Sequence, residues 1–89
     1  MPPTILLLQD DAWKAAVIDA LLAKASRPPV IIEWFRSSAA ALTRLSDRTK
    51  NTIAAVFVDL SLPEQHELQI FDDLFQAAPH IPILVLSSP

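Results

Sequence analysis

Short apolar runs alternate along the chain with amphipathic stretches, and this alternation predicts parallel strands connected by helices. The apolar runs predict strands over residues 4–8, 30–35, 53–58 and 83–86. Helices are expected over residues 10–25, from Ser37 or Ser38 through Leu45, and over 67–78. Right-handed crossovers would then give the strand order 2-1-3-4. The predicted fold class is α/β: a flavodoxin-like parallel sheet in βαβαβαβ order, with helices on both faces.

The first helix is expected to run through Trp13, Val17, Leu21 and Leu22. In the last helix Leu68, Phe71, Leu74 and Phe75 recur at three- and four-residue spacing, and this apolar stripe is expected to pack in the fold. A polar stretch over residues 46–52 is expected to form a loop. On this interpretation Trp34 and Phe35 lie at the core and its rim, and Trp13 either lines the mouth of a site or packs on its helix.

Three of the predicted strands are followed by oxygen-bearing side chains. The first leads into Gln9-Asp10-Asp11, the third into Asp59-Leu60-Ser61-Leu62-Pro63, and the fourth into Ser87-Ser88. The carboxyl ends of parallel strands meet at one edge of the sheet, where ligands bind in open α/β folds. Such a set suits a hard cation and a phosphoryl group. The alternative is that Asp59 only caps a turn.

Composition narrows the possibilities further. The chain has 89 residues, enough for one small domain, and 52% of them are hydrophobic, too many for a disordered segment. It has no cysteine, which fits a reducing cytoplasm and excludes a thiolate metal site. Its net charge of −3 comes with no basic cluster, which argues against nucleic-acid binding. No signal peptide or membrane-spanning run is present in the sequence.

These features together resemble the receiver domain of two-component response regulators. That family has an acidic pair after its first strand, a phosphoacceptor aspartate followed by x-x-x-Pro after its third, and a hydroxyl residue after its fourth. Asp59 through Pro63, Asp10 and Ser87 stand at matching places. The resemblance implies a cytoplasmic phosphoprotein of signal transduction, acting in a two-component system or phosphorelay. By the same resemblance it would be a phosphoacceptor and not an enzyme, with at most self-phosphorylation and dephosphorylation.

The resemblance also implies roles for particular residues. Asp59 would accept a phosphoryl group from a histidine kinase or phosphotransfer protein, and Ser87 would contact it. Mg²⁺ would be bound by Asp10, Asp59 and the backbone carbonyl of Ser61, with Asp11 and a water held by Gln9 as further candidates. An effector domain beyond Pro89 would be the output.

Gln9 departs from the family pattern because it stands where the first acid belongs. Replacing one acid by a neutral amide lowers the attraction for a cation. Two registers remain open: Gln9 and Asp10 fill the places of the acidic pair, or Asp10 and Asp11 form the working pair one residue along. The family's usual glycine is also absent, since the chain has none and Glu67 stands at that place.

The chain ends before the family's lysine, and residues 1–89 match only the first part of such a domain, without its last helix, strand and helix. Lys14, Lys24 and Lys50 are expected to lie far from the site. Strand 83–86 would then be an open edge, and the chain is expected to self-associate through it.

Two other functions compete with a phosphoacceptor. A pseudo-receiver, which keeps the fold for protein–protein contact without phosphorylation, is favoured by Gln9 and by the missing lysine. An enzyme of the haloacid-dehalogenase type would need a second acid two residues after Asp59, where the chain has Ser61. His66, in the expected loop after Asp59, and His80 have no metal-ligand partner at a recognisable spacing.

Overall fold

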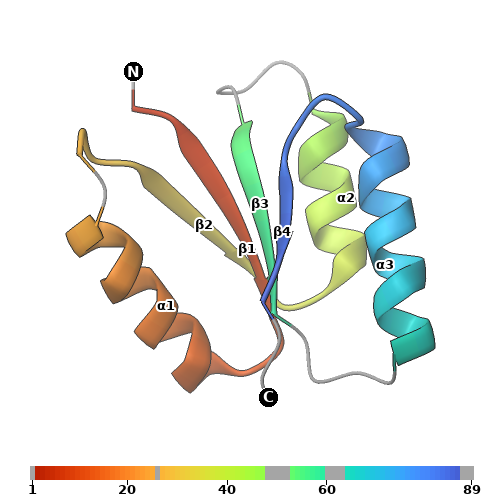
Figure 1. The fold of residues 1–89 in the computed structure, drawn as a ribbon, viewed down its shortest axis with the longest axis horizontal. Coiled ribbons are helices and arrows are strands. Elements are labelled where there is room, and N and C mark those ends of the chain that lie inside the picture. Colours follow the sequence, from red (N-terminus) through yellow and green to blue (C-terminus); the bar gives the residue numbers. More distant parts are fainter. Residues whose placement is uncertain (1, 26, 48–52, 60–63, 87–89) are drawn as a thin grey trace.

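The protein is described by a computed structural model that covers residues 2–25, 27–47, 53–59 and 64–86. Its elements are β1 (Thr4–Gln9), α1 (Ala12–Ala25), β2 (Ile31–Phe35), α2 (Ser38–Ser46), β3 (Ile53–Asp59), α3 (Glu64–Ala77) and β4 (Ile83–Val85). All strand pairs are parallel, in the order β2-β1-β3-β4 (Figure 1). The predicted flavodoxin-like α/β fold, its element order and its sheet order are confirmed.

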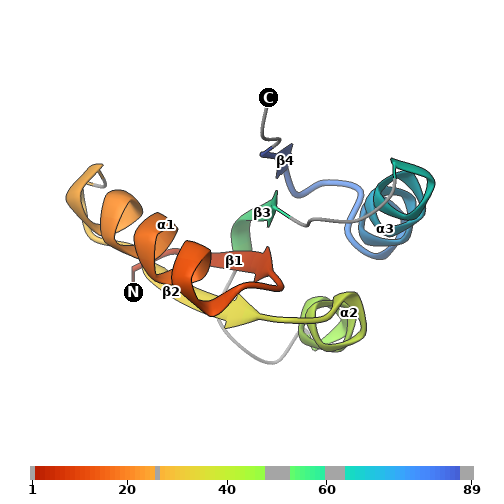
Figure 2. The same ribbon diagram turned by 90° about the horizontal axis from the view of Figure 1, so that it is seen from below.

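The helices lie on both faces of the sheet. In Figure 2 α1 lies on one side, beside β1 and β2, and α2 and α3 lie on the other side. No helix of the described residues covers β3 and β4 on the α1 side. Because every strand runs in the same direction, the carboxyl ends of β1 and β3 meet at the lower edge in Figure 1, where α1 begins.

The main core lies between the sheet and the helices α2 and α3. Alternate residues of β1 and β3 face it, because side chains along a strand alternate between the two faces. Its buried members are Leu6, Leu8, Ala41, Leu45, Val56, Val58, Leu74 and Ala78. The intervening residues, such as Leu7 and Phe57, therefore face the α1 side of the sheet.

The face that α3 buries differs from the expected stripe. Leu74 is fully buried and packs with Ala78 and the partly buried Ile70. Leu68, at 63% exposure, Phe71 and Phe75 are exposed and lie outside the core, so the predicted stripe is wrong for these three residues. The buried positions 70, 74 and 78 repeat every four residues, which is an equally regular helical spacing.

The α3 helix also begins earlier than expected, at Glu64 and not at Glu67. Residues 64–67 read Glu-Gln-His-Glu, and acidic residues are favoured in a first turn because the helix dipole is positive there. Without glycine in this stretch, nothing in the sequence interrupts the helix. His66 therefore lies on α3, exposed, and not in a loop.

Several large apolar residues of α1 are exposed to solvent. Trp13 is 78% exposed, and Val17 and Leu21 are exposed as well. Ala15 is the buried residue of this helix, with Ile18 and Leu22 half-buried. The α1 helix is therefore apolar on more than one face, and its small residue Ala15 lies against the sheet.

Local interactions fix α2 on the sheet. The Ser37 side chain accepts a hydrogen bond from the N–H of Ala40, which confirms one of the two expected N-caps. The helix continues to Ser46, a residue that was expected in the following loop. Arg44, buried on α2, donates through Nε to Glu33 of β2 at 2.7 Å and through a second nitrogen at 3.3 Å.

The backbone φ angles of the described residues are all negative. The chain has no glycine, and no described residue has a positive φ. Its described turns are therefore built without the left-handed conformation that glycine usually provides.

Candidate functional site

The candidate site lies at the carboxyl edge of the two central strands. Gln9 is the last residue of β1, Asp59 is the last residue of β3, and the two are partners in the parallel register. Both have the same strand parity as Leu7 and Phe57, so both face the side of the sheet that α1 covers. Each strand extends one residue further than predicted, and these two residues are therefore held by the sheet.

Gln9 and Asp59 are joined by a short hydrogen bond. Gln9 Nε2 donates to Asp59 Oδ2 at 2.6 Å. Gln9 is fully buried, whereas Asp59 is half-buried.

The opposite end of the Gln9 amide is also occupied. Its Oε1 accepts a hydrogen bond from the N–H of Asp11 at 3.0 Å. The carbonyl oxygen of an amide cannot donate, so the nitrogen has to face Asp59 and the oxygen has to face Asp11. The amide orientation follows from the network itself.

The two neighbouring acids, Asp10 and Asp11, have different surroundings. Asp11 Oδ1 accepts from the N–H groups of Trp13 at 2.8 Å and Lys14 at 3.2 Å, so this carboxylate caps α1. The helix begins at Ala12, and the acids precede it, so they do not lie in its first turn as expected. Asp10 is exposed. Capping by Asp11 favours the register in which Gln9 and Asp10 take the places of the acidic pair.

Trp34 extends the network to β2. Its Nε1 donates to the backbone oxygen of Gln9 at 2.8 Å, and the Arg36 guanidinium lies over its ring, 5.1 Å from the centroid. Trp34 is 42% exposed and bonds to the backbone beside the site, so the expectation of a core residue is wrong. Phe35 packs against the core, as expected. Sequence patterns do not report a contact between an indole and a backbone oxygen 25 residues away.

The first turn of α1 begins at this edge, and it brings Trp13 and Lys14 there. Trp13 is exposed, which disagrees with packing on its own helix and leaves a place near the site mouth as its remaining interpretation. The backbone N–H of Lys14 donates to the Asp11 carboxylate, and the backbone N–H of Asp11 donates to Gln9, so the backbone of Lys14 lies closer to the site than expected. Lys24 lies at the opposite end of α1. Lys50 lies outside the described residues.

Within the described residues, the donor set for a divalent cation is small. Asp59 keeps one oxygen, Oδ1, that makes no hydrogen bond with any described residue. Asp10 is exposed two positions before α1. No group of three or more His, Cys, Asp or Glu side chains in this part of the chain could hold a metal. One or two carboxylates with several waters are nevertheless a sufficient ligand set for Mg²⁺. Ser61 and Ser87 lie outside the described residues.

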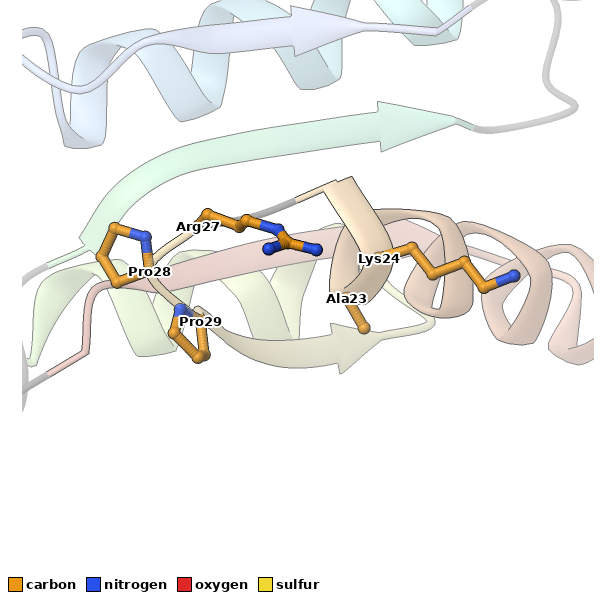
Figure 3. A pocket seen from close by; sticks show the side chains of 5 residues that line it. All are labelled: Ala23, Lys24, Arg27, Pro28 and Pro29. Carbon is orange, nitrogen blue, oxygen red and sulfur yellow. The ribbon is translucent and has the colours of Figure 1, made fainter.

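Among the described residues, two pockets lie on or near α1, and Asp59 lines neither of them. One of about 190 Å³ lies between Trp34 and the first turns of α1, lined also by Ala12, Ala15, Ala16 and Asp19. The other, about 460 Å³ and open, lies at the far end of α1 (Figure 3). Its lining is Ala23, Lys24, Arg27, Pro28 and Pro29. In Figure 3 the Arg27 side chain extends toward the end of α1.

Comparisons with protein-family models, curated proteins and solved structures found no match for this chain. Among the described residues, no helix is both long enough and apolar enough to cross a membrane.

Proposed function

We propose that this chain is a response-regulator receiver module that accepts a phosphoryl group on Asp59. The observation that supports this most is the placement of Asp59 at the carboxyl edge of a 2-1-3-4 parallel sheet, in register with Gln9 and next to the Asp10–Asp11 turn. This edge is the usual ligand-binding edge of such sheets. Asp59 Oδ1 makes no hydrogen bond with the residues that the structure describes, and it is the oxygen proposed to act as the nucleophile.

The proposed reaction is a phosphoryl transfer. An Asp59 carboxylate oxygen forms a bond to the phosphorus of a phosphohistidine as the P–N bond breaks, and the released imidazole nitrogen takes a proton from solvent. The product is an aspartyl phosphate. Mg²⁺, with Asp10 and Asp59 as its ligands and the Ser61 carbonyl as a further candidate, would neutralise charge on the phosphoryl oxygens. Ser87 is proposed to contact the transferred group.

The partners follow from this chemistry. The phosphodonor would be a histidine kinase or a phosphotransfer protein, and the output would be an effector domain outside these residues. Such signalling places the chain in the cytoplasm. The module itself would catalyse no more than its own phosphorylation and dephosphorylation.

Intact-mass measurement tests the proposal. The chain is incubated with Mg²⁺ and a small phosphodonor, beside an Asp59→Asn variant as matched control. We expect one phosphoryl adduct on the unmodified chain and none on the variant, because the amide cannot form the acyl phosphate. Asp72→Asn, at an exposed position of α3, should keep the adduct. This control shows that the adduct is lost only when the carboxylate of Asp59 is removed.

A pseudo-receiver is the second candidate, and the Gln9–Asp59 hydrogen bond favours it. This hydrogen bond occupies one carboxylate oxygen of Asp59. Gln9 also stands where the family has an acid, so the negative charge that attracts a cation to the site is smaller. Absence of any adduct, with Asp59→Asn and unmodified chain alike, would reject the phosphoacceptor and support a module for protein contact.

A further inference from the structure

Both polar atoms of the Gln9 side chain, and its backbone oxygen, form hydrogen bonds inside the fold. Its nitrogen donates to Asp59, its carbonyl oxygen accepts from Asp11, and its backbone oxygen accepts from Trp34. The residue is fully buried, and a buried amide without partners would destabilise the fold. One side chain thus connects β3, the turn into α1 and, through its backbone, β2.

The 2.6 Å separation shows what an acid would do at this position. A glutamate has the same length and shape, so its carboxylate would lie against that of Asp59. Two carboxylates in contact repel each other, and a nearby cation relieves the repulsion. With Gln9 the contact is attractive, and no cation is needed to hold the two side chains together.

We propose that Gln9 is a positioning residue that holds the Asp59 carboxylate in one orientation and so makes the local structure of this site independent of a divalent cation. The amide nitrogen supplies the attraction that a cation would supply to a pair of carboxylates. This statement concerns the fold of the site, and it holds whether or not Asp59 accepts a phosphoryl group.

Thermal unfolding with and without Mg²⁺ tests this inference on three chains: the unmodified chain, Gln9→Glu and Gln9→Met. Methionine removes the hydrogen bonds at similar size but adds no charge, so it is the matched control. Both variants should unfold at a lower temperature, by roughly 10 °C, because a charge-assisted bond is lost at a buried position.

The change in unfolding temperature on adding Mg²⁺ distinguishes the three chains. The unmodified chain and Gln9→Met should shift little on adding Mg²⁺, whereas Gln9→Glu should regain much of its loss. A large Mg²⁺ stabilisation of the unmodified chain, equal to that of Gln9→Glu, would overturn the inference. So would a Gln9→Glu chain that unfolds at the original temperature without Mg²⁺.

A double variant that exchanges donor and acceptor tests the Gln9–Asp59 hydrogen bond directly. It also tests the inference if Gln9→Glu alone does not fold. In the double variant Gln9→Glu/Asp59→Asn, the amide introduced on β3 can donate to the carboxylate introduced on β1, which still accepts from Asp11. We expect the double variant to unfold well above Gln9→Glu and to show little response to Mg²⁺. A double variant no more stable than Gln9→Glu would show that Gln9 does not act through Asp59.

Discussion

Asp10 and Asp11 are adjacent residues of the same type, yet the structure gives them different tasks. The Asp11 carboxylate is engaged by two N–H groups of α1, while Asp10 is exposed at the edge that carries Asp59. A carboxylate that caps a helix would have to give up those hydrogen bonds to bind a cation. Asp10 is therefore the better candidate for the metal ligand in the proposed receiver.

Asparagine substitutions distinguish these tasks. Asp10→Asn should slow phosphorylation of Asp59 at least tenfold and weaken Mg²⁺ binding, because a charged ligand is lost. Asp11→Asn should change both by less than about threefold, since an asparagine oxygen caps a helix nearly as well as aspartate does. Phosphorylation rates at several Mg²⁺ concentrations give the comparison. Equal effects of the two substitutions would support the alternative register, in which Asp10 and Asp11 work together.

At the same scale, the sequence identified the residues of the site but not their pairing. Oxygen-bearing residues after apolar runs marked Gln9, Asp10 and Asp59, and the parallel topology brings Gln9 and Asp59 into register. The donor contact between Gln9 and Asp59, and the indole of Trp34 beside them, depend on side-chain positions across three strands. Residue spacing within one strand contains no information about such contacts.

Among the elements, α3 provides the clearest test of which helix face is buried. Leu74→Ala should lower the free energy of unfolding by about 2–5 kcal/mol, because it opens a cavity at a fully buried position. Leu68→Ala makes the same chemical change on the same helix at an exposed position. It should cost less than about 1 kcal/mol. Urea unfolding measures both.

A loss at Leu68→Ala as large as that at Leu74→Ala would mean that α3 packs through the face first expected from the sequence, because both leucines belong to that face. The expected and the observed face share Leu74, so the cost at Leu68 distinguishes them. Far-UV circular dichroism of both variants would show whether helix content is retained before the free energies are compared.

The elements themselves were easier to predict than their orientation. Strands of four to six apolar residues between polar turns have few alternatives, and their order follows from the handedness of the crossovers. Both α1 and α3 have apolar residues on more than one face, so hydrophobic spacing alone does not choose the buried side. On α1, the small residue Ala15 lies against the sheet and the large Trp13 lies outside.

Considered as a whole, the molecule has one well-covered face and one partly open face. On the α1 side, Phe57 is half-buried and its partner Leu84 is 44% exposed. Val85, the next residue of the same short strand, faces the α2–α3 side and is 48% exposed at the end of the sheet. Trp13, Val17 and Leu21 add apolar surface on α1. Exposed apolar surface of this kind favours association with another chain, and so does the outer edge of β4, which no other described strand pairs.

We expect the chain to self-associate through β4 and to show a concentration-dependent sedimentation coefficient. Leu84→Lys should weaken the association at least about tenfold, because it removes an apolar side chain from the contact and adds a charge to it. Gln76→Lys, exposed on α3, adds the same charge elsewhere and should leave the association unchanged. A monomer at all concentrations would contradict this expectation.

The absence of glycine and of positive φ in the described residues has a consequence for mutagenesis. In most proteins, some alanine substitutions force a backbone out of a conformation that only glycine tolerates, and the measured loss mixes that strain with lost contacts. Here no described position requires such a conformation. An alanine scan of this chain would therefore map side-chain contacts directly, with each non-proline position of the described residues serving as its own backbone control.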